Sequence, residues 1–340
     1  MNITYIIGNG FDINLGLKTR YMDFYKWYVD RNRENTPDVV RMFTSEINDF
    51  IKENRKKEGD AIDWSDMELA LGQYTNKVPR DQFETLLLDI ADNLKAYLRI
   101  EYENRIHRKA YDVEKFKIQL ADPITDNFNI QRKRILQAFQ EQLTSGIEIR
   151  IISFNYTQTI EDLLDFKERQ IWESKTGQTV ELKIIKHIHH ILTDENILVG
   201  MNDVQQIANG NYHDDKNICE IFVKPSANRI LGNYVDWQCE SIIEDTDLFV
   251  LYGTSVGETD RYWWNMIAKR LLQSENTARM IWFVHDPIRM VHANLLYRNA
   301  GRDVIPHFGR VAGVPNISLE NLEKKIFVTL SNEMFSFSRE

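Results

Sequence analysis

The sequence predicts an α/β fold, in which a doubly wound and mostly parallel sheet carries a large helical insertion. Residues 247–252 and 279–284 form near-continuous apolar runs, which are typical of parallel strands buried on both faces. Segments of helical character, 157–164 and 261–272, follow predicted strands directly. A strand, a turn and a helix repeated around one sheet build this class of fold.

The first element is a buried strand that leads into a glycine-rich turn. Aliphatic and aromatic residues dominate positions 3–7, and the turn Gly8–Asp12 (GNGFD) follows. Its glycines and asparagine tolerate positive φ, and a turn of this kind at a strand end can bring backbone N–H groups close to a phosphate. Ile13 stands where the dinucleotide-binding pattern has its third glycine, so an ordinary chain reversal stays open as the alternative.

Residues 21–142 predict a helical insertion or layer packed on the sheet. Apolar residues recur there at helical spacing, as at Leu86 and Ile90. The sheet domain then consists of residues 1–20 and 143–330.

Strand character returns after the helical segment, at residues 147–153 and 180–185, where β-branched residues are dense. Residues 194–234 are richer in Asn, Asp and Gly, and we expect a loop or lid region there. Loops beside the carboxyl ends of strands often carry function.

Composition limits the classes of function. The 340 residues include 43% hydrophobic residues, enough for a buried core, and 42 basic against 51 acidic side chains give a net charge of −9, which makes nucleic-acid binding unlikely. Cys219 and Cys239 provide neither a zinc motif nor a disulfide framework. The sequence contains neither a signal peptide nor an apolar run of 18 residues, so we expect a cytoplasmic protein without a membrane partner.

Three predicted strand ends supply a candidate pocket, because the carboxyl ends of neighbouring parallel strands open on one crevice. Asn155 follows the second strand, and its amide can both donate and accept hydrogen bonds, although an N-cap role fits the same position. The candidate binding residues at these strand ends are Gly8, Asn9, Gly10, Phe11, Asp12, Thr157, Gly253, Thr254 and Ser255.

Histidines cluster at the end of the strand that begins at Val180. Strand alternation places His187 and His189 on one face, where they could bind a metal with Asp203 or His213. Nothing in their spacing requires a metal, and we expect none. An imidazole that exchanges protons near neutral pH is the favoured interpretation, and a structural histidine stays open.

Motifs along the chain resemble those of the bacteriophage abortive-infection AbiH family. The segment Gly8–Phe24 resembles the N-terminal signature of that family, and the further marks are Trp64–Glu68, Ile152–Thr157, Ile188–His189, Gly200–Asp203 and Gly253–Asp260. The family in turn resembles the sirtuin-like group of Rossmann-type NAD-binding proteins. Members share a glycine-rich first turn, an Asn after a central strand, a His-Gly step and a late Gly-Ser strand end.

The resemblance implies antiphage defence and a sirtuin-like site for NAD, as substrate or ligand. It implies hydrolysis of the bond between nicotinamide and ribose, with Asn155 orienting water and the ribose and His189 as acid or base. His190 departs from the glycine of the family pattern and leaves the backbone less room beside a ligand. Glu68, four residues after Trp64, is a candidate acid at the pocket rim, whereas a helix cap is the favoured role of Asp260.

Two rival functions stay open at this point. One is a metal-dependent nuclease that uses the histidines, and the other is a nucleotide sensor without catalysis that signals to a partner. Self-association into a homo-oligomer and a phage-derived trigger are further expectations.

Overall fold

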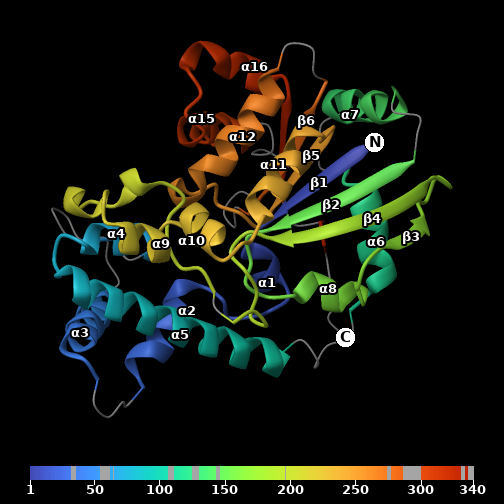
Figure 1. The fold of residues 1–340 in the computed structure, drawn as a ribbon. Coiled ribbons are helices and arrows are strands. Elements are labelled where there is room, and N and C mark those ends of the chain that lie inside the picture. Colours follow the sequence, from blue (N-terminus) through green and yellow to red (C-terminus); the bar gives the residue numbers. More distant parts are fainter. Residues whose placement is uncertain are drawn as a thin grey trace.

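The computed structural model describes residues 1–31, 36–53, 62–63, 65–105, 111–124, 130–142, 146–195, 197–273, 277–285, 300–330 and 334–335. Its strands are β1 (Asn2–Ile7), β2 (Ile147–Ser153), β3 (Gln170–Glu173), β4 (Thr179–His187), β5 (Leu248–Tyr252), β6 (Arg279–Val284) and β7 (Ile326–Leu330). They form one sheet in the order β3-β4-β2-β1-β5-β6-β7 (Figure 1). Only β3 runs antiparallel to its neighbour. The predicted α/β fold with a mostly parallel sheet is confirmed.

β1 lies at the centre of the sheet, where the winding of the chain reverses. Numbered along the chain, the six parallel strands lie in the spatial order 3-2-1-4-5-6, which is the strand order of Rossmann-type folds. Ile7 at the end of β1 pairs with Ser153 of β2 and Tyr252 of β5, so the three strands end level. Ligands of open α/β sheets bind at such a reversal point, beyond the carboxyl ends of the strands.

Helices cover both faces of the sheet, because successive side chains of a strand point to opposite sides. Ile3 and Tyr5 of β1 belong to the core on one face, whereas Ile6 belongs to the core on the other. The first face is covered by α6 (Val113–Ala121), α7 (Ile130–Gln142) and α8 (Thr159–Leu164). The second is covered by α11 (Val235–Glu244), α12 (Arg261–Leu272), α15 (Ala300–Val311) and α16 (Leu319–Glu323).

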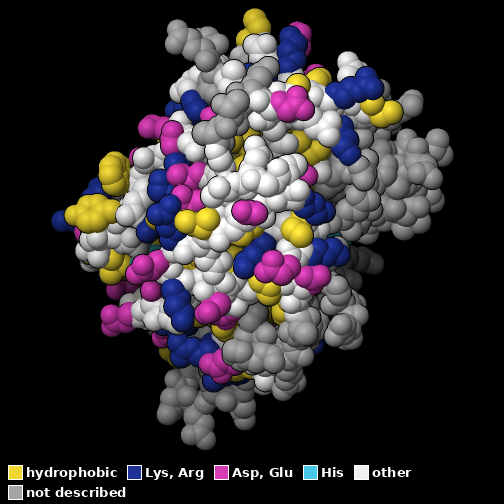
Figure 2. Space-filling model, turned by 90° about the vertical axis from the view of Figure 1, so that its right-hand side faces the viewer, with side chains coloured by type: hydrophobic (Ala, Val, Ile, Leu, Met, Phe, Trp, Pro, Cys, Tyr) yellow, Lys and Arg dark blue, Asp and Glu magenta, His cyan; other side chains and the backbone are white. Residues whose placement is uncertain are grey.

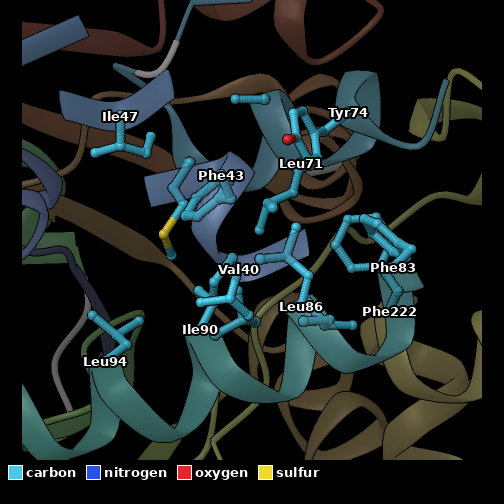
Figure 3. Close-up of a cluster of buried hydrophobic side chains, with 14 of the residues drawn as sticks. Val40, Phe43, Ile47, Leu71, Tyr74, Phe83, Leu86, Ile90, Leu94 and Phe222 are labelled. Carbon is cyan, nitrogen blue, oxygen red and sulfur yellow. The ribbon is translucent and has the colours of Figure 1, made fainter. Parts of the chain in front are cut away.

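A helical unit with its own core faces the carboxyl ends of the strands. In Figure 1 the strand arrows point toward this unit. Its helices are α2 (Tyr21–Val29), α3 (Asp38–Glu53), α4 (Met67–Tyr74), α5 (Arg80–Arg105) and α9 (Lys216–Phe222). Figure 3 shows side chains from α3, α4, α5 and α9 converging in this core, among them Phe43, Leu71, Ile90 and Phe222.

Two segments that the sequence analysis treated as single units, residues 21–142 and 194–234, each contain parts that pack in different places. Within residues 21–142, helices α2–α5 build the separate helical core, whereas α6 and α7 cover the sheet. Residues 194–234 contain loops, but also α9, α10 (Lys224–Ile230) and two short 3₁₀ turns, Val204–Gln206 and Gly210–Tyr212. Part of this region therefore packs as one wall of the helical core.

The surface carries mixed charge on the face shown in Figure 2. Among the described residues of that face, Lys and Arg side chains alternate with Asp and Glu and form no continuous basic area of the kind that nucleic acid prefers. None of the helices in the described ranges combines the length and the apolar character needed to cross a membrane.

Candidate functional site

A cavity of about 190 Å³ lies where the ends of β1, β2 and β5 meet the helical unit. The strand ends contribute Gly8, Asn9, Asp12, Phe154, Asn155, Tyr156, Thr157, Gly253, Thr254 and Ser255. The other lining residues are Thr19, Tyr21, Asp66, Glu68, Leu94, Leu98, His189, Gly257, Thr259 and Asp260. The candidate nucleotide-binding and catalytic residues chosen from the sequence all line this cavity except Gly10 and Phe11, whereas the candidate metal ligands His187, Asp203 and His213 do not. The three strand ends therefore converge on one pocket.

Backbone contacts join the turn after β1 to the turn after β5. Gly8 N–H donates to the Tyr252 carbonyl at 2.9 Å, and Gly10 N–H donates to the Gly253 carbonyl at 2.8 Å. A Cβ atom on Gly10 would lie 2.5 Å from Gly253 Cα, and Gly253 itself has a φ of +71°. The glycines are needed for the close approach of the two turns, and the amides of Gly8 and Gly10 are used inside the protein.

Phe11 lies in the core beneath the turn and not in the cavity. It is fully buried, and its ring centroid lies 5.6 Å from that of Phe335, 5.8 Å from that of Phe116 and 6.3 Å from that of Tyr252. The sequence placed Phe11 among the binding residues because it follows the two glycines. The structure shows that α1 (Gly10–Asn14) directs its ring into the apolar core of the sheet instead.

The turn after β5 offers backbone donors. Val256 has a φ of +55°, and its N–H donates to Thr254 Oγ1 at 3.3 Å. Within the described part of the chain, the N–H groups of Thr254 and Ser255 have no acceptor, and both residues line the cavity. The turn after β5 therefore offers more backbone N–H donors to a ligand oxygen than the turn after β1 does.

Asp12 is buried beneath the cavity and held by two threonines. Thr157 Oγ1 donates to one carboxylate oxygen at 2.5 Å, and Thr159 Oγ1 donates to the other at 2.7 Å. Burial raises the pKa of Asp12 to about 6, although these hydrogen bonds and the charge of His187 act against the rise. A carboxylate with a pKa near neutrality is suited to exchange a proton with a ligand or water.

Asn155 is the most unusual polar side chain of the site. It is only 4% exposed, and both of its amide atoms are buried without a hydrogen-bond partner among the described residues. The Asn155 amide lies close enough to Asp12 to lower the pKa of that carboxyl, although neither of its atoms reaches hydrogen-bond geometry with a described residue. Since buried polar groups are nearly always paired, an unpaired amide lining a cavity indicates a position at which a ligand or water completes the pairing.

His187 orients the backbone that carries Asn155. Its Nδ1 donates to the Asn155 carbonyl at 2.8 Å, and its Nε2 lies 2.7 Å from Glu161 Oε1. Burial lowers the pKa of His187, but the hydrogen bond and charge of Glu161 outweigh burial, so the pKa lies above its usual value. The two-sided contact fixes the turn at the end of β2.

Two carboxylates enter the site from the N-terminal end of α4. Asp66 caps this helix by accepting from Leu69 N–H at 3.1 Å, and burial together with the charge of Glu68 raises its pKa to about 6. Glu68 is buried, and its Oε1 accepts from Gly200 N–H at 3.2 Å. The predicted rim position of Glu68 agrees with the lining of the cavity, whereas Trp64 lies outside the described residues.

Lys224, at the start of α10, joins Glu68 to the histidine at the end of β4. Its ammonium lies 2.8 Å from Glu68 Oε2 and 3.0 Å from His189 Nε2, with Asp260 Oδ1 at 4.0 Å. His189 Nε2 also lies 3.3 Å from Asp260 Oδ1, which accepts from Asn202 Nδ2 at 2.9 Å. Burial raises the pKa of Asp260, but Lys224 and His189 outweigh it and hold that pKa below its usual value.

His190 adopts the conformation that the family glycine would adopt freely. Its φ is +65°, a left-handed value that costs a residue with a side chain about 1–2 kcal/mol. The imidazole Nε2 lies 2.9 Å from Asn228 Oδ1 and 3.1 Å from Asn233 Nδ2, so it donates to the first or accepts from the second. Its side chain therefore points toward α10 and α11 and not into the cavity.

Sequence reasoning missed Lys224 and Asp66. A single lysine at a helix start is usually exposed, and only the tertiary structure buries Lys224 to 3% exposure. Asp66 belongs to the quoted mark Trp64–Glu68, and its position before an apolar helix was the signal available for it. Asn202 belongs to another of these motifs, Gly200–Asp203, and its side chain donates a hydrogen bond to Asp260.

Each residue considered as a metal ligand makes its own contacts to a different part of the protein. His187 contacts the Asn155 carbonyl after β2 and Glu161 of α8, and His213 Nε2 donates to the Ile207 carbonyl at 2.7 Å. Asp203 caps the 3₁₀ turn Val204–Gln206. In the described ranges, no three His, Cys, Asp or Glu side chains are grouped as ligands of a metal ion.

The fold and the site define an α/β protein with Rossmann-type strand order and a cavity, lined by polar side chains, at the point where the sheet reverses its winding. The chain belongs to the bacteriophage abortive infection AbiH family, whose model matches residues 4–285. That match includes every residue that lines the cavity, and it assigns the protein to phage abortive infection. No curated protein matches the chain.

Proposed function

We propose that the protein serves abortive infection by binding NAD, or a closely related nucleotide, and hydrolysing the bond between nicotinamide and ribose. The observation that carries the proposal is Asn155, whose buried amide has no partner among the described residues and lies in a cavity at the carboxyl edge of a Rossmann-ordered sheet, where such sheets bind ligands. A ribose hydroxyl both donates and accepts, and so complements an amide that offers both kinds of atom.

The charge of the cavity supports the nicotinamide half of NAD as its occupant. Asp12, Asp66, Glu68 and Asp260 line the cavity, and its described lining contains no Lys or Arg. Nicotinamide carries a positive charge in NAD, and the ribose becomes cation-like as the bond to nicotinamide breaks. Carboxylates stabilise such a charge, whereas they repel phosphate.

The size of the cavity supports the same orientation. A volume of about 190 Å³ is below the range of about 300–1,000 Å³ for sites that enclose a drug-sized ligand. We therefore assign the nicotinamide riboside portion to the cavity and the rest of the dinucleotide to the space outside it. The free amides of Thr254 and Ser255 are suited to oxygens at the boundary between the two.

The reaction needs a base more than an acid. The bonding electrons between C1′ and the nicotinamide nitrogen leave with nicotinamide, which departs as a neutral base. A water oxygen bonds to C1′, and its proton must pass to the protein or to solvent. Asn155 would orient water and the ribose, and Asp12, with its raised pKa, and His189 are the groups that line the cavity and can take part in proton transfer. The products are ADP-ribose, nicotinamide and a proton.

Chromatography of free nicotinamide after incubation with NAD tests the proposal. We expect slow release by the wild type that persists in EDTA and is lost in Asn155→Ala. Asn76→Ala is the matched control, because Asn76 is exposed and is not part of the cavity lining. Calorimetry on the same samples separates the alternatives. Binding without release would favour a sensor, and the absence of both would contradict the proposal.

A further inference from the structure

Lys224 contacts His189, the one histidine among the described residues that line the cavity, and the contact constrains where that histidine carries its proton. Lys224 is buried on α10, in a region that packs with the helical unit, whereas His189 follows the sheet strand β4. Both partners of the lysine, His189 Nε2 at 3.0 Å and Glu68 Oε2 at 2.8 Å, lie within hydrogen-bond distance.

The chemistry of the two side chains decides the direction of this hydrogen bond. An ammonium group has three N–H donors and no lone pair, so it can only donate. His189 Nε2 must accept from Lys224, which it can do only without a proton of its own. The ring proton of a neutral imidazole then lies on Nδ1.

Asp260 competes for the same nitrogen and favours the opposite arrangement, in which Nε2 carries the proton and donates. The distance from Nε2 to Asp260 Oδ1 is 3.3 Å, longer than the usual range of about 2.7–3.2 Å for N–H···O bonds. Asp260 already accepts from Asn202, while the contact to Lys224 is the shorter one. The geometry favours Lys224.

We propose that Lys224 is a positioning residue that holds His189 as the Nδ1–H tautomer, so that His189 offers a ligand of the cavity a proton donor and not a base. With Nε2 engaged by Lys224, Nδ1 is the ring nitrogen left for the ligand. The catalytic consequence rests on the proposed NAD hydrolysis: the water proton then passes to Asp12 or solvent, and His189 donates a hydrogen bond to the bound nicotinamide riboside. The tautomer itself does not depend on the identity of the ligand.

Long-range ¹H–¹⁵N correlation spectra of protein labelled with [¹⁵N]histidine test the tautomer directly, at pH 8 and without ligand. His189→Gln identifies the signals of His189. His213 is an internal reference for the opposite tautomer, because its Nε2 donates to a backbone carbonyl. We expect the proton of His189 on Nδ1 and that of His213 on Nε2. A proton on Nε2 of His189 in the wild type overturns the proposal.

Two variants test whether Lys224 is responsible. Lys224→Met combined with Glu68→Gln removes the buried charge pair as a whole, and we expect the proton of His189 to move to Nε2 and to be donated to Asp260. Lys224→Arg retains donors and should keep Nδ1–H, which allows a test if the double variant does not fold. Persistence of Nδ1–H in a folded double variant, or its loss in Lys224→Arg, overturns the role of Lys224.

A matched control uses an exposed ion pair of the same composition. Lys216 and Glu220 lie one turn apart on α9, and Lys216→Met with Glu220→Gln should leave the His189 spectrum unchanged. Because these spectra require no NAD, they remain decisive if nicotinamide release is not observed. Failure of the proposed function and failure of the tautomer assignment are thus distinguishable.

Discussion

The replacement Asp12→Asn should stabilise the protein, and more so at higher pH. Burial raises the pKa of Asp12 from its ordinary value of 3.8 to about 6 in the folded protein. The folded state therefore binds more protons than the unfolded state between about pH 4 and pH 6, and the free energy of unfolding falls as pH rises through this window. Asparagine keeps the shape of the side chain and carries no charge, and its amide can pair with the hydroxyls of Thr157 and Thr159.

The magnitude follows from about 1.4 kcal/mol for each pH unit by which the pKa differs between the two states. Asp12→Asn should raise the free energy of unfolding by about 3 kcal/mol at pH 8 and by about 1.5 kcal/mol at pH 5. Urea denaturation at the two pH values measures this, with Asp92→Asn on the exposed face of α5 as the control. A variant that is less stable than the wild type at pH 8, or equally affected at both pH values, would refute the assigned burial cost.

Replacements at Asn155, Gly253 and Lys224, two of them with a companion variant, test the packing of the site. Asn155→Ala should change the free energy of unfolding by less than about 1 kcal/mol, because its amide has no hydrogen bond to a described residue, and a larger loss in urea denaturation would reveal a partner. Gly253→Ala should lower the free energy of unfolding by more than about 2 kcal/mol. The new Cβ would lie 2.6 Å from a backbone nitrogen, and the positive φ adds a further cost. Gly232→Ala, with positive φ and open space, should cost only about 1–2 kcal/mol, and equal losses would contradict the close approach of the turns. Lys224→Met alone should lower the free energy of unfolding by about 3–5 kcal/mol, because it leaves the buried charge of Glu68 unpaired. Adding Glu68→Gln should restore much of this loss, and a double variant as unstable as Lys224→Met would contradict the pairing.

Local sequence signals predicted the sheet and most of the cavity. The apolar runs of β5 and β6 identified buried parallel strands, and small or polar residues at strand ends identified the positions that line the cavity. Asn155 and His189 follow from this logic because the level ends of parallel strands bring them together. The short antiparallel strand β3 and the edge strand β7 were not predicted, because their four and five residues give too little pattern.

Contacts between distant segments could not be predicted in the same way. Gly8 and Gly10 were correctly associated with a tight turn, but the segment that approaches them, Gly253, lies more than 240 residues away. Lys224 is polar in sequence and buried in the structure, because Glu68 and His189 come from two other elements that meet it only in the folded chain. The separation of α2–α5 from α6 and α7 likewise depends on which core each helix meets, whereas helical periodicity is common to both groups.

The central claim is that the buried amide of Asn155 receives the ribose of a nucleotide at the point where the sheet reverses. A crystal structure of the protein soaked with NAD, or with a hydrolysis-resistant analogue of it, tests this claim most directly. The account predicts a ribose hydroxyl within hydrogen-bond distance of the Asn155 amide, with nicotinamide beside His189 and the phosphates outside the acidic cavity. Nucleotide bound elsewhere on the protein, or phosphates seated among Asp12, Asp66 and Glu68, would contradict it.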